Sequence, residues 1–134
     1  MEAVEIAGRI IGREYAPFLI AEAGVNHNGD VDMALALVDA AAQAGADAVK
    51  FQTFSADRLV TKQAPKAKYQ LETTNERESQ YQMLKALELS EGDHRLLLER
   101  CQQKGLIFLS SPFDEISADL LESLHVPAYK IPLR

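Results

Sequence analysis

Polar side chains stand near the ends of four short apolar segments of the sequence. They are Glu22 in FLIAEAG, Lys50 and Gln52 in GADAVKFQT, Ser110 and Ser111 in LIFLSS, and Lys130 in PAYKIP. If the segments are parallel strands, these side chains gather at one edge of a sheet, the edge where ligands bind in parallel α/β proteins. Lysine ammonium and serine hydroxyl groups donate to phosphate and carboxylate oxygens. The pattern therefore predicts a pocket for a small anion.

The lysine in GADAVKFQT is the most informative of these residues. An ammonium group buried without a partner either costs several kcal/mol or loses its proton. Because side chains alternate across a strand, Lys50 and Gln52 should face one side, while Val49 and Phe51 face the helices on the other. Lys50 then has two explanations, a substrate anion or a purely structural ion pair with Glu22. A lone buried pair seldom stabilises more than apolar residues would, which favours the anion.

The elements that position these residues alternate along the chain. Asp30 and Asp114 precede helical patterns as N-caps, Ser90 is followed by Asp93 in a capping-box spacing, and Gly105 closes that helix. The predicted strands cover residues 18–24, 47–53, 106–111 and 127–132, and the predicted helices cover 31–44, 76–88, 91–104 and 115–124. This order predicts an α/β fold of parallel strands with right-handed helical crossovers.

One long connection and three histidines have less certain roles. Residues 55–75 are polar and without a clear period, which is typical either of a lid or binding loop or of a solvated excursion. His27 follows the first strand, where it either orients the loop or binds a ligand. His94 and His125 lie at helix ends, where surface exposure is expected, and the three histidines share no metal-ligand spacing.

The composition excludes several classes of protein. The 134 residues are 47% hydrophobic with a formal net charge of −6, which suits one packed domain and argues against a nucleic-acid partner. No segment reaches the roughly 18 apolar residues of a membrane span, and the acidic N-terminus is unlike a signal peptide. The single cysteine, Cys101, is expected to be a buried thiol in a reducing cytoplasm.

Six ordered motifs resemble the sialic acid synthase family, which includes N-acetylneuraminate, legionaminate and pseudaminate synthases. They are IAEAGVNHNGD, AGADAVKFQTF, APKAKYQ, ESQYQMLKALELS, FLSSPFD and AYKIP. The resemblance implies a (β/α)8 TIM barrel that condenses phosphoenolpyruvate with an N-acylated amino sugar, such as N-acetylmannosamine, to give a nine-carbon sialic acid and phosphate. It also implies a divalent metal, manganese or magnesium, and a homodimer. Two motifs, APKAKYQ and FLSSPFD, suit the N-acetylneuraminate and legionaminate branches better than the pseudaminate branch, and the acceptor stays open.

The same resemblance implies roles for the strand-end residues. Lys50 and Lys130 would hold the phosphate or carboxylate of phosphoenolpyruvate, and Ser111 would donate to the same anion. Glu22 would face the acceptor sugar near the metal, and Gln52 would form hydrogen bonds within the pocket. Glu22 and Lys50 are therefore the expected catalytic residues.

Two further expectations concern the ends of the motif set. Asn26 and His27, in the loop after the first strand, are candidate loop contacts. At the other end the family continues KIP into Ser-Gly-Glu, whereas Leu133 and Arg134 follow here. Residues 1–134 are expected to form the N-terminal half of the barrel, without its second half, its metal ligands or the family's antifreeze-like domain. We interpret the chain as a truncated synthase that is inactive alone, and the alternative is a non-catalytic half-barrel that pairs with itself or another chain.

Overall fold

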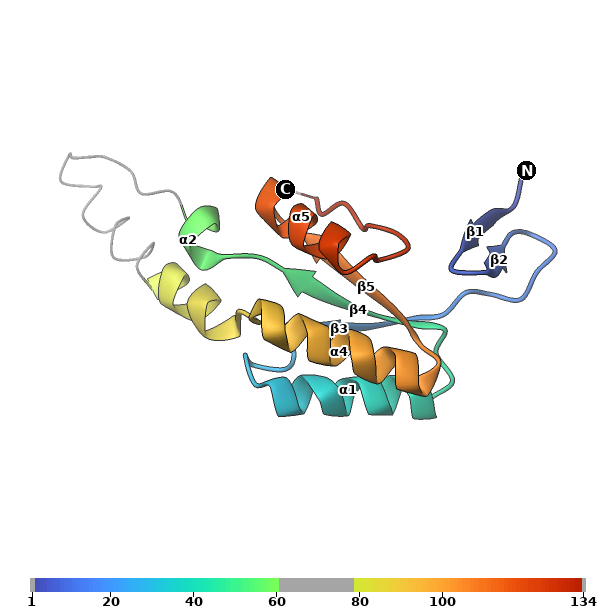
Figure 1. Ribbon diagram of the computed structural model, residues 1–134, viewed down its shortest axis with the longest axis horizontal. Helices are drawn as coiled ribbons and strands as arrows, with labels where there is room; N and C mark the ends of the chain where they lie inside the picture. Colours follow the sequence, from blue (N-terminus) through green and yellow to red (C-terminus); the bar gives the residue numbers. More distant parts are fainter. Residues whose placement is uncertain (1, 61–78, 134) are drawn as a thin grey trace.

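The centre of the fold is a small parallel sheet covered by helices. The computed structural model describes residues 2–60 and 79–133 (Figure 1). Three parallel strands lie in the order β3 (Ile20–Gly24), β4 (Ala48–Thr53) and β5 (Ile107–Pro112). Between and after them come α1 (Val31–Gln43), the short α2 (Ala56–Leu59), α4 (Glu91–Lys104) and α5 (Glu115–Ser123), and residues 79–87 are also helical. The predicted α/β class with parallel strands is confirmed.

The helices begin where the sequence places their capping residues. The Asp30 carboxylate accepts hydrogen bonds from the amides of Asp32 and Met33 at the start of α1. Ser90 and Asp93 form the reciprocal capping box of α4, and Gly105 ends that helix in the left-handed conformation with φ 71°. Asp114 caps α5. These caps satisfy amide groups that helices leave unpaired at their first turns, so local sequence sets the helix boundaries.

One face of the sheet supplies the hydrophobic core. Val49 and Phe51 of β4 and Phe108 of β5 are buried, and they join a cluster with apolar residues from all three long helices, among them Val38, Leu97, Cys101 and Leu121. The rings of Phe51 and Phe108 stack with centroids 5.9 Å apart. Helices α1 and α4 run side by side along this face (Figure 1). The predicted alternation of β4 is confirmed, because its apolar side chains enter the helix layer.

An antiparallel hairpin near the N-terminus was not predicted. It pairs β1 (Val4–Ile6) with β2 (Arg9–Ile11) through a turn in which Ala7 and Gly8 both have positive φ. Two positive φ angles are typical of the tight turns that suit a twisted hairpin. The Asp47 carboxylate holds the hairpin to the sheet through an ion pair with Arg9 and a 2.7 Å hydrogen bond from the Leu19 amide. Figure 1 places this hairpin beyond the amino ends of the strands, away from their carboxyl ends.

The predicted fourth strand is wrong. Residues 126–133 form no strand, although they follow α5 as expected. Pro127 and Pro132 flank the predicted strand and have no N–H to donate to a ladder. Pro112 also lacks a donor at the open edge of β5, because Thr53 already bonds the Phe113 amide at 3.0 Å, whereas the amides of Phe108 and Ser110 alternate to that edge. These prolines therefore weaken pairing of the segment with β5 without excluding it. Pro112 is itself the last residue of β5, one position beyond the predicted end of that strand at residue 111.

The long connection after β4 is only partly described. It begins with α2, a helical turn that the sequence did not indicate. Residues 61–78 lie outside the described part of the chain, so the prediction of a lid or binding loop stays a prediction there, as does the start of the helix expected over 76–88. Within the described ranges, no helix is long and apolar enough to cross a membrane.

The cysteine in α4 leads to the first testable prediction. Cys101 is fully buried, and burial raises the pKa of its thiol from 9.0 to about 12. An unfolded chain would ionise this thiol above pH 9 while the folded chain keeps it protonated, so stability should fall as the pH rises from 9 towards 12. We expect alkylation of Cys101 by iodoacetamide at pH 8 to occur only as fast as the protein unfolds. Rapid alkylation of the folded protein, followed by mass spectrometry, would contradict this burial.

Candidate functional site

The candidate site lies on the sheet face opposite the core, near the carboxyl ends of the strands. Lys50 and Gln52 face this side, since they alternate with Val49 and Phe51. The Lys50 ammonium forms an ion pair with the Glu22 carboxylate of the neighbouring strand, with 2.7 Å between Nζ and Oε2. The Lys50 side chain is 16% exposed and that of Glu22 is 53% exposed. Solvent therefore reaches the Glu22 carboxylate of this pair, whereas the Lys50 side chain is largely buried.

The strand register adds Gln52 and Ser111 to the same face. Gln52 lies opposite Ser111 across the parallel ladder of β4 and β5, and Ser111 is buried. Gly24 marks where Glu22 and Gln52 converge: a Cβ atom placed there would lie 3.2 Å from Glu22 Oε1 and 3.8 Å from Gln52 Nε2. One ammonium, one amide, one hydroxyl and one carboxylate thus share this face. The grouping of Glu22, Lys50, Gln52 and Ser111 agrees with the sequence-based expectation.

Two of the expected site residues stand apart from this group. Lys130 is exposed in the irregular segment after α5, because the strand that should have carried it to the sheet does not form. Asn26 is exposed in the turn between β3 and α1. Ser110, the other serine of β5, points into the core face instead, where its hydroxyl lies 2.7 Å from Thr53 Oγ1. The described structure therefore brings one lysine to the strand ends and not two.

His27 also lies on the core side. It is fully buried, its ring lies 6.1 Å from that of Phe51, and its Nδ1 accepts a 2.9 Å hydrogen bond from the Gly29 amide. Burial, with a smaller contribution from the nearby His94, lowers the pKa of His27. A neutral ring that orients the β3–α1 loop fits this geometry, which is one of the two roles that the sequence left open.

His94 contradicts the expectation of surface exposure. It is 1% exposed in the first turn of α4, where its Nδ1 lies 2.7 Å from the Ser90 carbonyl oxygen and its Nε2 lies 2.8 Å from Thr53 Oγ1. Burial lowers the pKa of His94, although the hydrogen bond to Ser90 opposes this. Sequence spacing did not reveal the role of His94, because its partner Thr53 lies 41 residues away along the chain.

The two buried histidines predict a pH dependence of stability. Because folding lowers the pKa of both histidines below the usual value of 6.5, the unfolded chain takes up protons first as the pH falls through 6.5. The free energy of unfolding should therefore decrease between pH 7.5 and pH 5.5, measured by urea denaturation. His94→Gln should reduce this slope, because it removes one of the two buried rings. Equal slopes in the wild type and the His94 variant would refute the assignment.

The loops that follow β4 and β5 are tied together beyond the strand ends. Arg58 of α2 donates a 2.7 Å hydrogen bond to Asp114 and a 3.3 Å hydrogen bond to the Ser117 hydroxyl at the start of α5. Burial opposes ionisation of Asp114, but the hydrogen bonds from Arg58 and Ser117 outweigh it and lower the pKa of the carboxyl. Asp114 is therefore ionised at neutral pH and serves both as helix cap and as the partner of Arg58.

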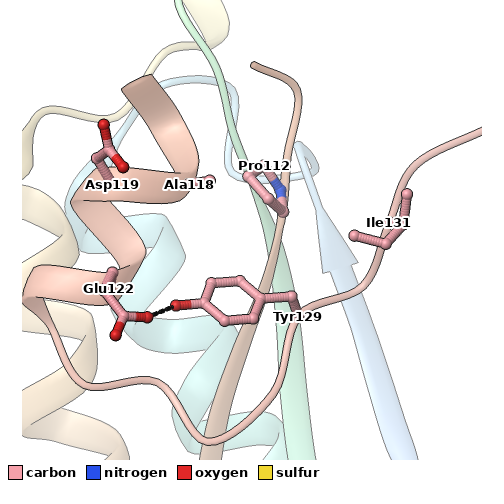
Figure 2. Close-up of a pocket in the computed structure, with 6 residues that line it drawn as sticks. All are labelled: Pro112, Ala118, Asp119, Glu122, Tyr129 and Ile131. Carbon is pink, nitrogen blue, oxygen red and sulfur yellow. Dashed lines mark hydrogen bonds between the residues drawn. The ribbon is translucent and has the colours of Figure 1, made fainter. Parts of the chain in front are cut away.

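A groove of about 310 Å³ opens elsewhere, between α5 and the segment that follows it. Its lining comes from Pro112, Ala118, Asp119, Glu122, Tyr129 and Ile131. Figure 2 shows the Tyr129 hydroxyl directed at Glu122, to which it donates a hydrogen bond. None of the predicted site residues lines this groove. Among the described residues there is also no cluster of three or more His, Cys, Asp or Glu side chains that could hold a metal ion.

The parallel strands and the helices that pack on them define an α/β protein, and its polar strand ends form a candidate ligand site at the carboxyl edge of the sheet. Residues 37–133 match the model of the NeuB family, and the chain belongs to that family. It is 57% identical over 121 residues to the N,N'-diacetyllegionaminic acid synthase of Legionella pneumophila, covering 90% of this chain and 34% of that protein. The corresponding synthase of Campylobacter jejuni is 49% identical over 114 residues, covering 85% and 34%.

A solved structure supports the same relationship. The N-acetylneuraminic acid synthetase of Leptospira borgpetersenii superposes with a TM-score of 0.81 at 31% identity, covering 97% of this chain and 41% of that one. The chain thus spans about a third of the length of the curated relatives it matches. The resemblance drawn from the six motifs is confirmed at the level of the family, whose named members here are synthases of sialic-acid-type sugars.

Proposed function

We propose that the face carrying Glu22, Lys50, Gln52 and Ser111 binds phosphoenolpyruvate for condensation with an N-acylated amino sugar. The observation that supports this most strongly is the Lys50–Glu22 pair, whose carboxylate is half exposed. A solvent-exposed ion pair contributes only about 0–1 kcal/mol to stability, so structure alone is a weak reason to place Lys50 there. An anionic substrate is a stronger reason for a lysine at this position, because a charge-assisted hydrogen bond in a partly desolvated pocket is among the stronger polar contacts.

The residue types suit the charges of this reaction. Lys50 would bind a phosphate or carboxylate oxygen of phosphoenolpyruvate, and the Ser111 hydroxyl would donate to the same anion. Gln52 would orient the substrate, and Glu22 would face the acceptor sugar. Fixed donors of this kind stabilise negative charge where it develops, without reorganising at the moment of reaction. Lys130 is a further proposed contact of the same anion, as the resemblance to the family implies, although it is exposed and away from this face in the described structure.

The barrel, the dimer and the metal belong to the same proposal. We propose that residues 1–134 form the first half of a (β/α)8 barrel, that the complete enzyme is a homodimer, and that this chain alone is inactive. A divalent metal ion does not fit the described residues, because only Glu22 offers a carboxylate on the proposed face and no ligand cluster is present there. Its ligands would come from the rest of the enzyme.

The acceptor sugar is proposed from the identities to the relatives. The chain is 57% and 49% identical to two N,N'-diacetyllegionaminic acid synthases, against 31% for the N-acetylneuraminic acid synthetase of Leptospira. We therefore propose a diacetylated amino sugar of the legionaminic type as the first acceptor to test, with N-acetylmannosamine as the second.

A second candidate function has its own structural support. Leu19 and Ile20, at the outer strand β3, are 55% and 47% exposed, and β5 also has an open edge in the described structure. Unpaired edges and exposed apolar side chains favour association with another chain. A non-catalytic half-barrel would use these surfaces without binding phosphoenolpyruvate.

Titration with phosphoenolpyruvate, followed by nuclear magnetic resonance of the 15N-labelled chain, separates the two functions. The proposed enzyme function predicts saturable shifts at Lys50, Gln52 and Ser111, with smaller shifts at the distant Gly45 and Gly105. Association alone predicts shifts that depend on protein concentration and not on phosphoenolpyruvate. Absence of any response to phosphoenolpyruvate at millimolar concentration would contradict the proposed site.

A further inference from the structure

A chain of three buried polar side chains crosses the core face beneath the proposed site. Thr53 of β4 stands at its centre, with Oγ1 2.8 Å from His94 Nε2 and 2.7 Å from Ser110 Oγ. All three residues are buried, with exposed fractions of 3%, 1% and 0% for Thr53, His94 and Ser110. Buried polar groups are costly unless they are paired, so this arrangement holds its members in a narrow set of positions.

The hydrogen-bond directions follow from the partner at the far end. The Ser90 carbonyl can only accept, so the His94 Nδ1 that lies 2.7 Å from it carries the proton. The neutral ring, which burial favours, then accepts at Nε2 from the Thr53 hydroxyl. Thr53 Oγ1 in turn accepts from the Ser110 hydroxyl. The chain therefore runs in one direction, from Ser110 through Thr53 to His94.

Each strand residue of this chain is next to a residue of the proposed site. Thr53 follows Gln52 in β4, and Ser110 precedes Ser111 in β5, with side chains on opposite faces of the sheet. In the described structure β5 pairs with no strand other than β4. The bond between Thr53 and Ser110 thus links the side chains of the two strands just where Gln52 and Ser111 lie opposite each other.

We propose that His94 is a positioning residue for the anion site: through Thr53 and Ser110 it fixes the spacing of Gln52 and Ser111 on the other face. This inference rests on the proposed function, because the residues that His94 would position, Gln52 and Ser111, are the proposed contacts of phosphoenolpyruvate. His94 itself does not touch the substrate. It anchors the carboxyl ends of β4 and β5 to the first turn of α4, which the Ser90 capping box makes rigid.

The test compares Thr53→Val, which removes the hydroxyl with little change in shape, with Thr53→Ser, which keeps it. Ser117→Ala is the matched control, because it removes another buried hydroxyl, which accepts a hydrogen bond from Arg58 and takes no part in the chain from Ser110 to His94. We expect Thr53→Val to weaken phosphoenolpyruvate binding by about five-fold or more, and both Thr53→Ser and Ser117→Ala to stay within about two-fold. Affinity equal to the wild type in folded Thr53→Val would overturn the inference.

A second readout needs no ligand. In Thr53→Val, the resonances of the Gln52 side-chain amide and the Ser111 backbone amide should move, whereas Thr53→Ser should leave them close to wild type. If the wild-type chain binds no phosphoenolpyruvate, the proposed function fails, and these resonances alone decide the positioning role. Unchanged resonances overturn it. If Thr53→Val does not fold, Ser110→Ala replaces it, since this variant keeps the Thr53–His94 bond. The readouts are the same: the Ser111 amide resonance should move and the affinity for phosphoenolpyruvate should fall. An unchanged resonance or an unchanged affinity would overturn the inference.

Discussion

Replacement of Lys50 by alanine is expected to weaken the binding of phosphoenolpyruvate by about ten-fold or more. A hydrogen bond to a charged group contributes about 1.5–3 kcal/mol, and 1.4 kcal/mol corresponds to a factor of ten in affinity. Lys50 is also the one cation that the described structure places on the face with Gln52 and Ser111. Its removal leaves Glu22 as an unopposed negative charge beside the anion, which adds to the loss.

Two matched variants separate charge from packing in this experiment. Lys50→Met keeps most of the side-chain stem, which is largely buried, and removes only the charge. Lys104→Ala removes a lysine at the far end of α4 and should change affinity less than two-fold. Isothermal titration calorimetry gives the affinities, and urea denaturation gives the stability of each variant. A Lys50→Met chain that binds as well as the wild type but unfolds more easily would support the structural ion pair instead.

Gly29→Ala is expected to destabilise the protein by on the order of 3 kcal/mol or more. Gly29 has φ +76°, and a Cβ atom there would lie 1.9 Å from the Ala86 carbonyl oxygen. That oxygen belongs to the backbone of the helical residues 79–87, so the clash cannot be relieved by a side-chain rotation. Relief requires the β3–α1 loop, which carries His27, to move away from this helix.

Gly45→Ala provides the control for backbone conformation. Gly45 has φ +83°, but nothing lies within 4 Å of its Cβ position. The free energy of unfolding of this variant should fall only by the cost of a non-glycine residue in the left-handed region, about 1–2 kcal/mol. The difference between the two variants, measured by urea denaturation, therefore isolates the contact with Ala86. Equal losses would show that the loop and the helix are not packed as the structure has them.

Short-range signals made most of the fold predictable. The caps at Asp30, Ser90 and Asp114 act within one helical turn of the residues they bond, so the sequence alone locates the starts of α1, α4 and α5. Alternation in β4 likewise separates Lys50 and Gln52 from the core without knowledge of any other segment. The hairpin of β1 and β2 had a weaker local signal, Ala7-Gly8 between the triplets Val-Glu-Ile and Arg-Ile-Ile, and it was not predicted.

Long-range contacts account for what could not be predicted. The burial of His94 depends on Thr53, a partner that no local pattern identifies. Lys130 was placed at a strand end because its segment is apolar, but a strand also needs a paired neighbour, and the described structure pairs β5 with β4 alone. Likewise, Ser110 and Ser111 are alike in sequence, and only the register shows which one faces the proposed site.

The most direct test of the central proposal is the release of inorganic phosphate from phosphoenolpyruvate. The chain would be mixed with manganese, a diacetylated amino sugar of the legionaminic type, and a second polypeptide carrying the remaining part of the Legionella relative. We predict release with both polypeptides present, none with either alone, and a loss of at least ten-fold with the Lys50→Ala chain. Release that is equal for wild-type and Lys50→Ala chains, or no release although the two polypeptides assemble, would contradict the proposal that this face binds the reacting phosphoenolpyruvate.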